Sequence, residues 1–121
     1  MMNLKRIFAI AAMCAGFALA GHADAHAHPK SMLPAADAAV ASPAEVRMTF
    51  NEALEPSFSA LTVLDPAGHA VAGSKTEVDS DTHVTMHMSL PALAPGVYTV
   101  KWVAVARDGH RTNGSYSFTV K

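Results

Sequence analysis

Two short stretches of the chain carry residue types that can bind a metal ion. The first is His28-Pro29. A histidine at the start of a chain offers an α-amine and an imidazole, which can close a chelate ring on one ion. The amine has a reference pKa of about 7.7–8.0, so its deprotonation costs little near neutral pH. Pro29 has no amide proton for Cu(II) to displace, which leaves coordination positions for other side chains. The plainer alternative is that His28 follows a cleavage site by chance.

The second stretch is Asp108-Gly109-His110, which follows a long run of alternating residues that ends at Arg107. Residues two apart in extended backbone point to the same side, so the carboxylate and the imidazole can converge on one ion. Asp-Gly is also an ordinary hairpin signal, and a polar histidine suits a loop. The two stretches therefore predict a metal site only when they are taken together.

The combined donor set is one amine, two imidazoles and one carboxylate oxygen, from His28, His110 and Asp108. Three nitrogens and one oxygen in a plane suit Cu(II), which also leads the affinity order of the divalent ions. Zinc favours tetrahedral sets or thiolates, and calcium and magnesium need more oxygens. We therefore expect one Cu(II) ion per chain.

The composition of the chain excludes several other functions. It has 121 residues, of which 50% are hydrophobic and 16% are charged, and its formal net charge is -1. This balance excludes a disordered polyelectrolyte and a basic nucleic-acid-binding protein. The sequence has no serine nucleophile elbow, phosphate-binding loop, His-Glu-x-x-His pattern or Cys-x-x-Cys pair. We therefore expect a binding protein rather than an enzyme.

Residues 1–27 are predicted to be a secretory signal peptide. Lys5 and Arg6 form a basic start, and the apolar run from Ile7 to Ala20 is shorter than the about 20 residues that a membrane helix needs. The only cysteine, Cys14, lies in this run without a small residue before it, so we expect no lipid anchor. This pattern predicts export to the periplasm.

The position of the cleavage site decides which residue begins the mature chain. Cuts after Ala20, Ala25 or Ala27 all satisfy the small-residue rule for signal peptidase. We favour the cut after Ala27, because it frees the amine of His28. The mature domain is then 28–121, and it contains no cysteine for a disulfide.

The rest of the chain is a series of short alternating runs separated by turn residues, with almost no helix signal. Tyr98 comes two residues after Gly96, which ends the turn Pro95-Gly96, and the tyrosine corner of Ig-like sandwiches likewise lies near the start of a strand. Short strands with frequent turn signals indicate one all-β domain, an Ig-like β-sandwich or Greek-key barrel of about seven strands. Strands are predicted over 45–50, 59–64, 75–79, 83–90, 96–107 and 115–120.

Four segments, in order, carry a likeness to a known family: His28-Pro29, 48–56, 93–102 and 108–120. Together they resemble the CopC-type periplasmic copper-resistance proteins, which are small Ig-like β-sandwich copper carriers. The resemblance implies that the Cu(II) ligands are the N-terminal histidine and the Asp-x-His pair, which correspond to His28, Asp108 and His110. It also implies a role near the site for Glu52, as an axial ligand or a residue behind the ligands. The alternative for Glu52 is a solvated loop carboxylate.

The same resemblance implies partners and a possible second site. The partners would be an inner-membrane copper importer or a periplasmic copper oxidase, and the chain would be a monomer. Some members of the family bind Cu(I) in a methionine-rich loop, but the corresponding region, 65–81, contains no methionine. Met86 and Met88 are instead expected in the core. His83 and His87 share the opposite face of their strand, where they form either a weak second metal site or solvated surface.

Two other functions compete with a copper carrier. A histidine at the chain start and a second histidine on a β-sandwich also resemble the copper brace of polysaccharide monooxygenases. Against that oxidase, Asp108 would occupy the plane in which oxygen must bind. A structural Ig-like module is the second alternative, and it predicts no metal and no dependence on the N-terminus.

Overall fold

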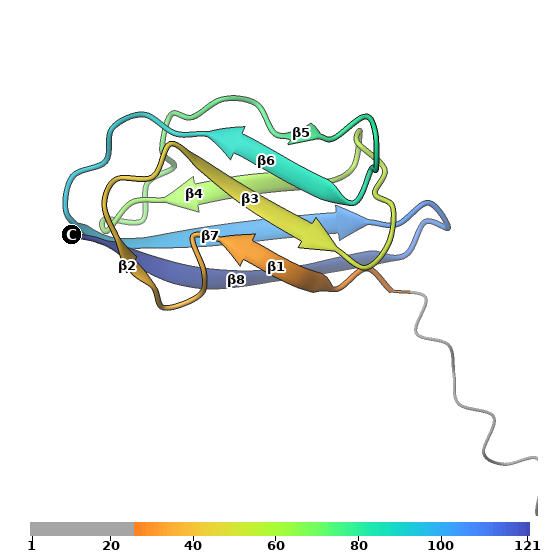
Figure 1. Ribbon diagram of the computed structural model, residues 1–121, viewed down its shortest axis with the longest axis horizontal. Helices are drawn as coiled ribbons and strands as arrows, with labels where there is room; N and C mark the ends of the chain where they lie inside the picture. The colour runs from red at the N-terminus through yellow and green to blue at the C-terminus, as the bar shows by residue number, and fades with distance from the viewer. Residues whose placement is uncertain (1–25) are drawn as a thin grey trace, which may run out of the picture.

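Residues 26–121 of the computed structural model form two stacked β-sheets, and nearly all of the predicted signal peptide lies outside these described residues (Figure 1). One sheet has the strand order β1-β3-β6-β5 and the other has the order β2-β8-β7-β4. Strand β2 runs parallel to β8, and the other pairs are antiparallel. The strands are β1 (Pro29–Leu33), β2 (Ala39–Val40), β3 (Glu45–Phe50), β4 (Ala60–Leu64), β5 (Glu77–Val78), β6 (Thr85–Ser89), β7 (Gly96–Val105) and β8 (Arg111–Val120).

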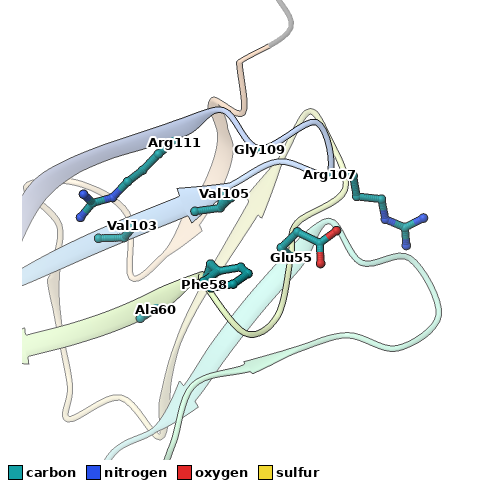
Figure 2. A pocket seen from close by; sticks show the side chains of 8 residues that line it. All are labelled: Glu55, Phe58, Ala60, Val103, Val105, Arg107, Gly109 and Arg111. Atoms are coloured by element: carbon teal, nitrogen blue, oxygen red, sulfur yellow. The ribbon is translucent and has the colours of Figure 1, made fainter.

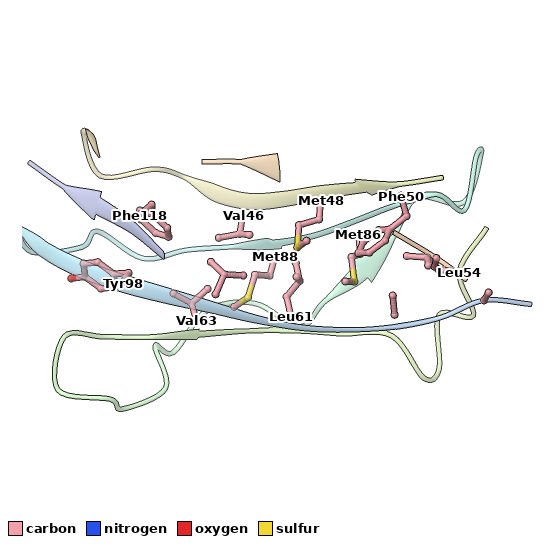
Figure 3. Close-up of a cluster of buried hydrophobic side chains, with 14 of the residues drawn as sticks. Val46, Met48, Phe50, Leu54, Leu61, Val63, Met86, Met88, Tyr98 and Phe118 are labelled. Carbon is pink, nitrogen blue, oxygen red and sulfur yellow. The ribbon is translucent and has the colours of Figure 1, made fainter. Parts of the chain in front are cut away.

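The core lies between the two sheets and is filled by the inward side of each alternating strand (Figure 3). Val46, Met48 and Phe50 of β3 are buried at every second position, as period-two alternation requires. Met86 and Met88 of β6 lie in the same cluster, which confirms that they are core residues. No disulfide is needed to explain the packing, because these apolar side chains form one contiguous cluster.

The tyrosine corner predicted at Tyr98 is confirmed. The Tyr98 hydroxyl donates a hydrogen bond of 2.7 Å to the carbonyl of Ala94, just upstream in the chain. The Tyr98 ring stacks on Phe118 with centroids 5.7 Å apart. This ring contact joins the start of β7 to β8, and the hydrogen bond to Ala94 is the one that defines the tyrosine corner of Ig-like sandwiches. The all-β sandwich expected from the sequence is therefore the observed fold.

The structure differs from the predicted strands mainly at the edges. Strand β1 was not predicted, because it starts with a proline and carries a register shift between Pro29 and Ser31, which breaks its alternation. Strand β2 has only two residues, Ala39–Val40. Strand β8 begins at Arg111, earlier than the predicted start at residue 115. The prediction missed its first part because Gly114 interrupts the alternation of the sequence there. A side chain at Gly114 would lie 2.7 Å from the Trp102 ring, so this position is selected by packing. Among the described residues, no helix is long and apolar enough to cross a membrane.

One end of the sandwich brings together the segments that hold the candidate ligands. The start of β1, the loop after β3 and the hairpin between β7 and β8 all lie at this end (Figure 1). The hydroxyl of Thr112 donates a 2.7 Å hydrogen bond to the carbonyl of Ala27, across a wide separation in sequence. The fold therefore places the backbone at residue 28 next to the 108–110 loop.

Candidate metal centre

The backbone around His28 is fixed by Asn51, the first residue after β3. Its side-chain oxygen accepts a hydrogen bond of 2.6 Å from the backbone nitrogen of His28, and its amide group donates one of 3.3 Å to the carbonyl of His26. The backbone nitrogen of Asn51 also donates to the carbonyl of His28, at 3.1 Å. Three hydrogen bonds through one residue thus hold this segment in position. Sequence reasoning missed Asn51, because its partners are backbone atoms far away in the chain.

Ala27 anchors the same segment to the core of the domain. Its side chain is fully buried in the core cluster, and its carbonyl accepts the hydrogen bond from Thr112. The residue at which we expect the signal peptide to end is therefore packed as part of the domain. This packing bears on where the exported chain begins.

The hairpin loop holds Asp108 and His110 in direct contact. The backbone nitrogen of His110 donates a 3.0 Å hydrogen bond to one carboxylate oxygen of Asp108, and its Nδ1 lies 2.7 Å from the other. Gly109 between them has a φ of 91°, a left-handed conformation that suits glycine. The hydrogen bond from the His110 backbone, followed by that from its side chain, lowers the pKa of Asp108 below its ordinary value.

The distance between the Asp108 oxygen and His110 Nδ1 suits two ligands of one ion. Two atoms that bind a metal at right angles, each about 2.0 Å away, lie about 2.8 Å apart. The observed separation is 2.7 Å. These two atoms are therefore close enough to bind one ion. As the side chains stand, no three histidine, cysteine or acidic residues within 26–121 close around a metal position.

His26 also lies at this centre, and it would be the first residue of the mature chain if the signal peptide were cut after Ala25. Its ring centroid is 4.9 Å from that of His110 and 6.4 Å from that of His28. The pattern His-Ala-His was the available signal, because residues two apart in extended backbone share a side. The structure thus brings the predicted residues His28 and His110 to the same end of the sandwich, and the ring of His26 lies near both of their rings.

Comparison with known proteins identifies the family. Residues 29–121 match the family model described as the CopC domain. The chain belongs to the CopC domain family. The crystal structure of CopC from Methylosinus trichosporium OB3b is similar with a TM-score of 0.75 and 33% identity, over 79% of this chain and 94% of that one.

Two further relatives of this CopC-domain chain are named for copper. PcoC, a methionine-rich copper resistance protein from Escherichia coli, has a TM-score of 0.71 and 36% identity, over 80% of this chain and 100% of that one. The copper transport protein CutJ of Bacillus subtilis is 35% identical over 98 residues, which are 79% of this chain but 18% of CutJ. The family assignment made from the four sequence segments is thus confirmed.

Glu52 lies at the same end of this CopC domain, directly after Asn51, and it is half-buried. Its position agrees with a place beside the ligands. Its role as an axial ligand or as a residue behind them stays a prediction.

The histidines proposed for a second site do not share one strand face. The residue His83 lies in the turn before β6, with a φ of 60° and its backbone nitrogen bonded to the carbonyl of Asp79. This left-handed turn breaks the alternation that would have aligned it with His87. Thr85, which lies between the two histidines in the chain, is buried, and its hydroxyl is hydrogen-bonded to that of Thr49.

His87 itself lies on the outer face of β6 among acidic side chains. Its Nε2 is 3.3 Å from a carboxylate oxygen of Asp79, and Glu45 and Glu77 each lie 3.9 Å from the ring nitrogens. The guanidinium of Arg47 contacts Glu45 at 3.1 Å and Asp79 at 3.4 Å. Because the arginine already neutralises part of this cluster, the outer face of β6 in this CopC domain is explained as an ion-pair network.

Proposed function

We propose that this chain is a periplasmic Cu(II)-binding protein that sequesters the ion or delivers it to another protein. Membership of the CopC domain family supports a copper-binding role in copper resistance. One structural observation carries the assignment of the ligands: the Asp108 oxygen and His110 Nδ1 lie 2.7 Å apart on a hairpin that is bonded to the segment leading into His28.

The proposed donor set is the amine and imidazole of His28, the imidazole of His110 and one oxygen of Asp108. A signal-peptide cut after Ala27 provides the free amine. Asn51 already bonds the backbone nitrogen of His28, so this atom is positioned before any metal arrives. The lowered pKa of Asp108 keeps its carboxylate charged and ready to bind a cation. Three nitrogens and one oxygen around one ion favour Cu(II).

This ligand set suits a carrier better than an oxidase. Four protein donors from His28, His110 and Asp108 would hold the ion and would leave little room for dioxygen to bind it. A carrier has no need of an open position for dioxygen, because it has only to hold and release the ion. The transfer direction is then set by the affinity of the partner protein.

Electron paramagnetic resonance of the 28–121 chain with one equivalent of Cu(II) tests the proposal. We expect one axial Cu(II) signal with hyperfine structure from three nitrogens. His110→Ala should remove one nitrogen from the spectrum, whereas His69→Ala, in another exposed turn, should leave it unchanged. A spectrum that is identical in the wild type and His110→Ala would overturn the proposed ligands. Oxygen uptake with ascorbate and a glycan, beyond that of free copper, would favour the oxidase.

A further inference from the structure

A groove of about 760 Å³ lies on the outer face of the second sheet, beside the metal-binding hairpin (Figure 2). Its floor is apolar and comes from Ala60 of β4 and from Val103 and Val105 of β7. Phe58 stands at its side, and 69% of this residue is exposed. Apolar surface gathered in a hollow, rather than scattered, is typical of an interaction site.

Phe58 is exposed but held in place. It belongs to a turn in which the backbone nitrogens of Phe58 and Ser59 both donate to the carbonyl of Glu55. Two further bonds attach this turn to β7: the Glu55 nitrogen donates to the Val105 carbonyl at 2.7 Å, and the Val105 nitrogen donates to the Ser59 hydroxyl at 3.1 Å. Because the backbone at Phe58 is already fixed, only its side chain has to be ordered on binding, which favours this residue as an anchor.

The charge around the groove is mostly positive. Arg107 and Arg111 line it, and their side chains extend in opposite directions from the hairpin (Figure 2). Among the described lining residues, Glu55 alone carries a carboxylate. The groove continues into a second hollow that shares Ala60, Val103 and Arg111 and adds Lys101, and the described lining of this part contains no acidic residue.

These cations contrast with the rest of the molecule. The chain has a formal net charge of -1, and the outer face of the other sheet carries Glu45, Glu77 and Asp79 with Arg47 among them, which leaves the acidic side chains in excess in that cluster. Charge is therefore separated between the two faces of the sandwich. Such a separation orients a partner before contact, and the groove face attracts an acidic one.

The groove and the metal centre share one loop. Arg107, Gly109 and Arg111 line the groove, whereas the two residues between them, Asp108 and His110, hold the proposed ligands. A partner in the groove thus contacts the neighbours of both ligands. In CutJ the CopC-like part is a small share of a longer copper transport protein, which shows that this domain occurs joined to other protein segments.

We propose that this groove is the docking surface for the copper-exchanging partner, which inserts an acidic segment that also carries apolar side chains. The apolar side chains pack on Phe58 and the valines, and the carboxylates pair with Arg107, Arg111 and Lys101. The docked segment is held beside Asp108 and His110, so copper has a short path between the proteins. The docking surface stands on its own contacts, and only its link to copper rests on the proposed function.

A peptide of alternating glutamate and leucine, six residues long and blocked at both ends, is the probe. Matched peptides carry glutamine or lysine in place of glutamate. We expect the glutamate peptide to shift the backbone NMR signals of Val103, Val105 and Arg107 in the copper-free 28–121 chain, and to bind at least about fivefold more tightly than the glutamine peptide. Equal binding of the three peptides, or shifts confined to the face around Glu45, overturns the proposal.

Variants of the chain test the individual contacts. Phe58→Ala should weaken binding of the glutamate peptide about tenfold, and Arg111→Glu about fivefold. Leu33→Ala and Lys121→Glu are the matched controls, because they change an exposed apolar residue and a cation elsewhere, and they should have little effect. Self-association of the free chain that Phe58→Ala abolishes would assign the groove to a second copy and overturn the proposal.

The same peptide separates this proposal from the proposed function. If the chain binds the peptide but fails to bind Cu(II), the docking surface stands and the proposed copper function is overturned. Normal Cu(II) binding by a chain that ignores the peptide would overturn the docking surface alone.

Discussion

The carboxylate of Asp108 accepts two hydrogen bonds from His110, one from its backbone nitrogen and one from its imidazole Nδ1. The first closes the turn, and the second orients the ring. One acidic residue therefore builds the loop and sets the direction of the proposed copper ligand. The conformation of the hairpin and the position of the proposed ligands therefore depend on the same residue.

Substitution of Asp108 by asparagine should weaken Cu(II) binding more than it weakens the fold. Asparagine can still accept the hydrogen bond from the His110 backbone, but it provides a neutral and poorer ligand. We expect the affinity for Cu(II) to fall at least about 10- to 100-fold, as measured by competition with a chelator. The matched control is Asp65→Asn, because Asp65 also accepts backbone hydrogen bonds in a turn that precedes a histidine, His69. An equal loss in both variants would contradict the prediction.

Acid should release copper through the nitrogen ligands before it affects Asp108. The hydrogen bonds from His110 lower the pKa of Asp108, so its carboxylate stays charged below the ordinary range. Imidazoles have a reference pKa of about 6.5, so we expect Cu(II) affinity to fall steeply below about pH 6. Binding at neutral pH should release protons, which calorimetry in buffers of different ionisation enthalpy can count. Full occupancy at about pH 4 against an equimolar chelator would rule out imidazole and amine ligands.

The copper-free chain should show a different pH dependence at the hairpin. Because the folded-state pKa of Asp108 is lowered, its contribution to stability is present above its unfolded pKa and is lost as pH falls through the folded value. The residue is exposed, so solvent keeps this contribution small. Hydrogen exchange of the His110 amide at falling pH would follow it, and Asp108→Asn should remove the dependence.

The two tyrosines should respond in opposite ways to replacement by phenylalanine. Tyr98→Phe deletes the hydrogen bond to Ala94 and should lower the free energy of unfolding by about 1 kcal/mol. The hydroxyl of Tyr116 is buried, and within residues 26–121 no hydrogen-bond partner reaches it. Tyr116→Phe should therefore raise the free energy of unfolding by about 1 kcal/mol. Urea unfolding of the two variants is the measurement, and a decrease in both would contradict this assignment.

The same burial makes the effect of Tyr116 depend on pH. Burial raises the pKa of Tyr116 to about 12, so the folded chain resists its ionisation. The unfolded chain ionises this group near the ordinary value of 10.0. Stability that rests on the neutral form is thus complete below that pH and is lost as pH rises toward 12. Tyr116→Phe should flatten the alkaline part of the stability profile.

Alternation alone predicted most of the sandwich, because half-buried strands repeat with period two. It found the strands β3, β6 and β7 and the core methionines of β6, and the turn before Tyr98 located the tyrosine corner. It missed β1 and β2, because a proline, a register shift and a length of two residues leave no period to detect. The prediction from alternation also failed at His83, because the left-handed backbone conformation of this residue breaks the alternation of side chains along the strand.

The candidate site was only partly predictable for a different reason. The contact between Asp108 and His110 is local, so its spacing is visible in the sequence. The approach of residue 28 to the hairpin depends on Asn51 and Thr112, which bond backbone atoms far away in the chain. Any residue with a suitable donor or acceptor can make such bonds, so no motif marks them. The likeness to the CopC-type proteins supplied that link before the structure did.

The first residue of the exported chain should decide both copper binding and stability. A chain that starts at Ala27 keeps the buried methyl group and the bond to Thr112, but it moves the amine away from His28. Compared with a chain that starts at His28, we expect its Cu(II) affinity to fall at least about 100-fold and its free energy of unfolding to rise by about 1 kcal/mol. Equal affinity of these two chains would show that the His28 amine is no ligand.

A chain that starts at His26 provides the third comparison, because signal peptidase can also cut after Ala25. It retains the Ala27 anchor and adds an imidazole whose ring lies 4.9 Å from that of His110. Its Cu(II) spectrum should therefore differ in nitrogen hyperfine structure from that of the chain that starts at His28. Thr112→Val is the control for the anchor: it should destabilise the chains that contain Ala27 by about 1 kcal/mol and leave the shorter chain nearly unchanged. Mass determination of the N-terminus of the exported protein then shows which of these chains, and therefore which spectrum, represents the protein in the cell. A start at His26 would move the amine donor from His28 to that residue.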